Sequence, residues 1–159
     1  MSKRSLEKKL GADAIARITQ AVQAAEKKTS AEIAVFIREW TLLRSHFIRA
    51  RNTHQAIRQR AEKLFVKHGL NHTRDHNAIM IYVTLKERIA VVLGDTAIHE
   101  MVPEGTWKSL TDRISHAAKK GNLAFGIEQA ITQAGEVLAT HFPLKPDDQN
   151  ELPDAPNLG

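Results

Sequence analysis

Cysteine is absent from the 159 residues of this sequence, and aromatic residues make up only 5% of it. Without cysteine there is no disulfide framework, no thiol nucleophile and no thiolate ligand for a metal ion. No apolar run approaches the roughly 18 residues of a membrane-spanning helix, and the basic start MSKRSLEKKLGADA has no apolar signal segment. The length suits one domain. The sequence therefore predicts a cytoplasmic protein with no membrane span.

Basic residues outnumber acidic ones, which gives a net charge of +5, and they are unevenly spread. Most of the excess lies between Arg38 and Asp75, whereas residues 143–159 are acidic and rich in proline. A basic surface attracts anionic partners through a field that salt screens. RNA or another polyanion is therefore one candidate ligand, with these contact residues: Arg49, Arg51, Arg58 and Arg60. The competing interpretation is a helix face that is merely solvated.

Hydrophobic periodicity predicts helices over residues 13–28, 53–68, 103–120 and 123–142, and strands over residues 33–37, 78–85 and 89–93. We expect Gly69 to end the second helix in a left-handed conformation, which glycine adopts at little cost. Only a short link separates the last two strands, so they should pair as an antiparallel hairpin. This order favours an α/β sandwich built on a small mixed sheet.

The chain divides into a predicted domain over residues 1–142 and an acidic, proline-rich tail over residues 143–159. Pro143 stops the last helix. The tail has almost nothing apolar to bury, so we expect it to be extended or disordered and dispensable for folding.

Polar residues gather at the ends of the predicted hairpin. Asp75 directly precedes its first strand, and Asp95 directly follows its second, so both should lie at one edge of the sheet. His99 and Glu104 follow closely in the sequence. Carboxylate oxygens with an imidazole suit a hard divalent cation such as calcium or magnesium. The competing interpretation is structural: Asp75 and Asp95 cap turns, and Glu104 favours a helix N-terminus.

Four segments occur in a characteristic order: AEIAVFI, KLFVKHGL, TRDHNAIMIYVTLKERIAVVLGDTAIHEMVPEGTW and KKGNLAFGIEQAI. Together with NELPD in the tail they resemble the TPM domain family. The resemblance implies a three-layer α/β/α sandwich. Some members of that family bind calcium or another divalent ion in loops at the sheet edge, and a plant member is regarded as an acid phosphatase. Other members assist the assembly or repair of membrane complexes.

The match to the family's motifs is partial. Where the family has Asp-Asn-Gly before a strand, this sequence has Asp75 followed by His76, Asn77 and Ala78. His99 stands where an acidic residue is frequent, and Glu104 follows Pro103 where the family has Pro-Asp. Residues 40–51 are an insertion relative to the compact form of the domain.

Three functions are consistent with these observations. The first is a non-catalytic interaction or assembly domain for an unknown protein partner, with a divalent cation as a structural clip. The second is a metal-dependent phosphatase-like hydrolase of phosphomonoesters, in which Asp75, Asp95 and Glu104 hold the ion. In that enzyme His99 would transfer a proton and Arg74 would neutralise the phosphate. The third is a protein that binds RNA or another polyanion through its basic helix.

Overall fold

The computed structural model describes residues 3–39, 53–103 and 105–159. The helices are α1 (Lys3–Leu10), α2 (Ala14–Glu26), α3 (Thr53–Lys67), α4 (Thr96–Met101), α5 (Thr106–Lys119) and α6 (Leu123–His141), with a 3₁₀ turn η2 (Leu70–His72). The strands are β1 (Glu32–Arg38), β2 (Ala78–Thr84), β3 (Ile89–Gly94) and β4 (Asn157–Leu158). In these residues no helix combines the length and apolar character that a bilayer crossing requires.

The four strands form one mixed sheet in the order β3-β2-β1-β4. The predicted hairpin is confirmed, because β2 and β3 pair antiparallel from Ile79 opposite Gly94 to Thr84 opposite Ile89. β1 pairs parallel with β2 on one side and with β4 on the other. The sheet edge at which β1 and β2 begin is therefore also the edge at which β3 ends.

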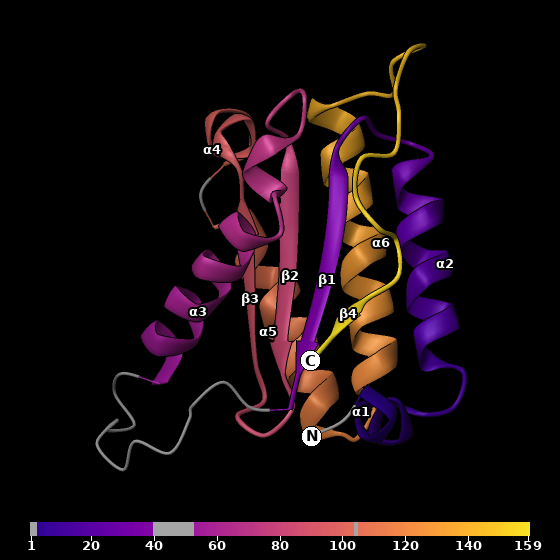
Figure 1. The fold of residues 1–159 in the computed structure, drawn as a ribbon, viewed down its shortest axis with the longest axis vertical. Coiled ribbons are helices and arrows are strands. Elements are labelled where there is room, and N and C mark those ends of the chain that lie inside the picture. Colours follow the sequence, from indigo (N-terminus) through magenta and orange to yellow (C-terminus); the bar gives the residue numbers. More distant parts are fainter. Residues whose placement is uncertain (1–2, 40–52, 104) are drawn as a thin grey trace.

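Helices cover both faces of the sheet, as Figure 1 shows. One buried cluster joins α2, α5 and α6 to the sheet, and a second cluster joins α3 and η2 to the opposite face. Residues from Ile33 to Ile37 are all buried and contribute alternately to the two clusters. A continuous apolar strand is what a sheet covered on both faces requires. The fold is the predicted three-layer α/β/α sandwich.

Gly69 ends α3 as predicted. Its φ is 74°, in the left-handed region, and its amide donates to the carbonyl of Val66 at 3.1 Å. Leu70 and Phe65, on either side of this turn, are both buried in the α3 cluster. The turn thereby directs the chain back toward the start of β2.

Four elements were not predicted: α1, η2, α4 and β4. In α1 only Leu6 is buried, so the helix has no periodic apolar stripe. α4 is six residues long and β4 is two. Elements this short contain too few side chains to show a period.

The tail is extended and lies against the sheet. From the end of α6 it descends beside β1 and finishes as β4 (Figure 1). Leu152 packs against the α3 cluster and Leu158 against the opposite one. The Arg38 guanidinium donates to the Asn157 carbonyl at 2.9 Å and to its side-chain oxygen at 2.8 Å. Residues 143–159 thus contact the buried clusters on both faces of the sheet.

Candidate functional site

The start of β2 and the end of β3 place Asp95 beside His76. The Asp95 amide donates to the carbonyl of Ala78 at 2.9 Å, and the amide of Ala97 donates to the carbonyl of His76 at 3.1 Å. The buried Asp95 carboxylate lies 3.2 Å from His76 Nδ1. Asp95 stands at the N-cap of α4, but its side chain makes no capping hydrogen bond. Its carboxylate therefore engages the imidazole of His76 rather than the start of the helix.

Asp75 lies in an ion-pair network that links the sheet edge to the tail. Its Oδ2 is 3.0 Å from Lys145 Nζ and 3.4 Å from a guanidinium nitrogen of Arg74. Arg74 also pairs with Asp147 at 3.3 Å, and its amide donates to the Glu151 carboxylate at 3.0 Å. The hydrogen bond from Lys145, aided by Arg74, holds the pKa of Asp75 below its usual value. We call Arg74, Asp75, Lys145, Asp147 and Glu151 the edge network.

Glu32 fastens the tail at the start of β1. Its side chain is buried, and its two oxygens accept the amides of Glu151 at 3.0 Å and Leu152 at 3.2 Å. Burial raises the pKa of Glu32 to about 7. These two bonds satisfy a carboxylate that the apolar strand would otherwise leave unpaired.

A second carboxylate, Glu26, lies at the end of α2 next to Glu32. It accepts the amide of Ile33 at 2.8 Å. Burial, followed by repulsion from Glu32 and Asp154, raises the pKa of Glu26 to about 9, so it is protonated at neutral pH. Glu26, Glu32, Asp148 and Asp154 line a hollow of about 390 Å³ between α2 and the tail. We call this the acidic hollow.

The acidic hollow was missed by sequence reasoning. Glu26 is the last residue of an ordinary amphipathic helix, and Glu32 is the first residue of an apolar strand, so neither has a distinctive local pattern. The tail segment NELPD, which contains Asp154, was the one available signal. The sequence of that segment does not indicate which part of the domain it contacts.

The described part of the structure shows no cluster of the predicted metal ligands. Within that part of the chain, no three His, Asp or Glu side chains are placed to hold a metal ion. Glu104 lies outside the described residues. His99 is exposed on α4 and lines a separate hollow of about 370 Å³ with Arg58 and Trp107. The set of Asp75, Asp95 and Glu104 therefore stays a prediction.

Of the four predicted polyanion contacts, the structure describes two. Arg49 and Arg51 lie outside the described residues. Arg58 and Arg60 are exposed on α3, where Lys63 and Lys67 are exposed as well. Glu62 pairs with Arg58 at 3.3 Å. The solvent face of α3 is therefore basic, while its opposite face enters the core.

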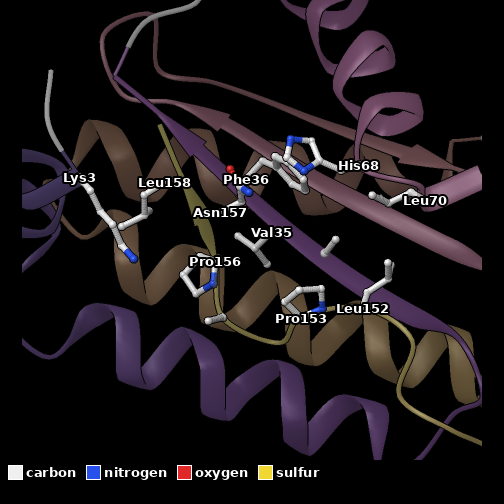
Figure 2. Close-up of a pocket in the computed structure, with 12 residues that line it drawn as sticks. Lys3, Val35, Phe36, His68, Leu70, Leu152, Pro153, Pro156, Asn157 and Leu158 are labelled. Carbon is white, nitrogen blue, oxygen red and sulfur yellow. The ribbon is translucent and has the colours of Figure 1, made fainter.

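A further cavity, of about 330 Å³, lies between β1 and the tail. Figure 2 shows Lys3 at one end of it, Leu152 at the other, and the tail prolines Pro153 and Pro156 along one side. The His68 and Phe36 rings meet edge to face with centroids 5.0 Å apart. Burial lowers the pKa of His68 and so favours its neutral form. The lining is mostly apolar, and the described residues contribute no carboxylate to it.

The fold and this edge define a small α/β/α sandwich protein whose own tail closes a charged edge of the sheet. The family model of the TPM domain matches residues 6–137, and the chain belongs to that family. It is also similar to BA42, a protein of the psychrophilic bacterium Bizionia argentinensis with a structure solved by NMR. The identity is 30%, the match covers 94% of this chain and 95% of BA42, and the TM-score is 0.79. None of the curated proteins matches the chain.

Proposed function

We propose that this TPM-domain protein is a non-catalytic interaction domain that assists the assembly of a protein complex. The observation that carries the proposal is the edge network. A phosphatase needs Arg74 free to receive phosphate and Asp75 free to hold an ion, whereas here they pair with each other and with the tail. Charges used in this way fix the tail to the sheet. The cytoplasmic location stays a prediction.

The position of His99 supports the same proposal. A proton donor must reach the bond that it cleaves, within hydrogen-bond distance or through one water. His99 lines a hollow with Arg58 and Trp107, while Arg74 and Asp75 face the tail. His99 and Arg74 therefore have different neighbours in the described residues, which supports a non-catalytic role.

Hydrolysis of p-nitrophenyl phosphate in the presence of calcium, magnesium or manganese tests this proposal. We expect no metal-dependent rate above that of the Arg74→Met variant. Metal-dependent turnover that both Arg74→Met and His99→Ala abolish would contradict the proposal and favour the phosphatase-like hydrolase.

A divalent cation acting as a structural clip belongs to the same proposal. Asp75 and Asp95, together with Glu104, supply oxygen donors of the kind that calcium and magnesium prefer. The fit is incomplete, because Asp75 already has two cationic partners and Asp95 engages His76. An ion would have to replace these contacts, so we expect weak binding.

Calorimetric titration of calcium and magnesium into the wild type and Asp95→Asn tests the clip. Asparagine keeps the shape of the side chain and removes one charge, so ion affinity should fall while the fold survives. Equal affinity of the two proteins, or no binding to the wild type, would leave Asp95 as a hydrogen-bond partner of His76 alone.

Polyanion binding is a second candidate function, and one observation favours it. Arg58, Arg60, Lys63 and Lys67 are all exposed on α3, where the exposed Glu62 pairs with Arg58. An excess of exposed basic side chains on one helix gives a positive field that attracts phosphate-rich ligands.

A further inference from the structure

The corner where α5 meets α6 presents an exposed aromatic side chain. Phe125, in the first turn of α6, is 58% exposed. Isolated exposed hydrophobic residues are common on protein surfaces and carry no meaning by themselves. What sets Phe125 apart is the hollow that it borders.

This hollow has a volume of about 320 Å³ and an apolar floor. Ala117 of α5 and Gly126 of α6 form part of its lining. The two helices approach so closely here that a Cβ on Gly126 would lie 2.4 Å from the Ala117 Cβ. Small residues therefore keep the two helices together and leave the space beside Phe125 open, with room for an apolar side chain.

The walls of the hollow are basic. Arg113, His116 and Lys120 line it, and among the residues that the structure describes no acidic side chain does. Within the described parts of the chain, neither Arg113 nor Lys120 has an ion pair. By contrast, Lys108 on the same helix pairs with Asp112 at 2.8 Å. The cations at this corner are therefore available to an outside anion.

We infer that the α5–α6 corner binds a short acidic peptide segment of a partner protein, one that presents an apolar side chain beside its carboxylates. The inference rests on the proposed role as an interaction domain and names its surface. The apolar side chain enters between Phe125 and the Ala117–Gly126 floor, and the carboxylates pair with Arg113 and Lys120. A nucleic acid would use the cations but has no side chain for the floor, so the combination favours a peptide.

The inference is tested by NMR titration of the ¹⁵N-labelled protein. The probes are the peptide acetyl-Asp-Glu-Leu-Asp-Glu-amide, the same peptide with alanine in place of leucine, and a heparin fragment. We expect the leucine peptide to shift amide signals of residues 113–129 and to bind more tightly than the alanine peptide. Phe125→Ser and Arg113→Glu should each weaken binding about tenfold, which corresponds to about 1.4 kcal/mol.

Val66→Ser is the matched control. Val66 is 59% exposed on α3, on the other side of the sheet, and its replacement should leave peptide binding unchanged. The inference is overturned if the leucine peptide causes no shifts at millimolar concentration. It is also overturned if both peptides and heparin shift α3, or if Val66→Ser weakens binding as much as Phe125→Ser.

The experiments distinguish failure of the proposed interaction domain from failure of the α5–α6 docking surface. Absence of peptide binding, with no hydrolysis of p-nitrophenyl phosphate, removes only the α5–α6 corner as a docking surface. Metal-dependent hydrolysis overturns the interaction domain whatever the peptide does.

Discussion

Single residues fix the backbone where the elements meet, and Gly69 is the clearest case. Its φ of 74° places it in the left-handed region, yet a Cβ built there would touch nothing within 4 Å. The cost of another residue is therefore conformational rather than steric. This separates Gly69 from Gly126, where the neighbouring helix occupies the space.

Replacing Gly69 with alanine should lower the free energy of unfolding by about 1 kcal/mol, because alanine disfavours the left-handed region. Asparagine tolerates that region better, so Gly69→Asn should lose less. Urea denaturation of the three proteins measures the difference. Equal stability of all three would mean that the helix end adjusts without cost.

Buried carboxylates make the stability depend on pH. In the folded protein burial raises the pKa of Glu26 from 4.5 to about 9, so the folded state holds a proton that the unfolded state releases. Stability is then fully present below about pH 4.5 and is lost as the pH rises toward 9. Glu32, with a pKa of about 7, adds to the loss in the lower part of this range.

Glu26→Gln should flatten this dependence. Glutamine retains an oxygen for the amide of Ile33 and never ionises. We expect thermal melts of the variant and the wild type to be similar at pH 5, and the variant to be more stable at pH 9. Parallel pH profiles for the two proteins would show that Glu26 ionises freely in the fold.

The helices and strands differ in how well the sequence predicts them. Long apolar periods predicted α2, α3, α5 and α6, and the short link predicted the β2–β3 hairpin. The tail strand β4 was not predictable, because its pairing with β1 depends on residues that are adjacent only in the folded sheet. The acidic hollow was hidden for the same reason: Glu26 and Asp154 meet only once the tail has docked.

Deleting residues 146–159 should leave cooperative unfolding and lower its midpoint. The two buried clusters are built almost entirely from the rest of the chain, which preserves cooperativity. The midpoint falls because Leu152 and Leu158 lose their contacts and Glu32 loses both amide donors. Circular dichroism melts measure this change.

The truncated chain with Glu32→Val serves as the control. Valine removes the carboxylate that the deletion leaves buried without donors, so part of the lost stability should return. If the deletion alone leaves the midpoint unchanged, the docked tail contributes nothing to the fold.

At the scale of the whole molecule, basic residues lie on both sides of the sheet. α3 carries its basic residues on one side, whereas Arg113 of α5 and Lys120 at the C-cap of α5 lie on the other. Two double variants that lose the same charge, one on each side of the sheet, can therefore show whether polyanion binding depends on α3 or only on net charge.

Removing Arg58 and Lys63 by Arg58→Gln and Lys63→Gln should lower the salt concentration at which the protein leaves a heparin column, because fewer counterions are released on binding. The pair Arg113→Gln and Lys120→Gln, with the same change in charge, should lower it less. Equal elution of both variants would indicate attraction by net charge and not by α3.

The docked tail also has a kinetic consequence. The Glu151 amide reaches Glu32 from 119 residues away along the chain, and closing so long a loop adds an entropic cost to that contact. The docked tail is therefore expected to form late in folding and to open first, as a small unit of its own. While it is open, the outer edge of β1 is bare, and a bare strand edge is where a second molecule can add a strand. The rate at which the tail opens thus sets how often this protein is exposed to domain swapping and aggregation.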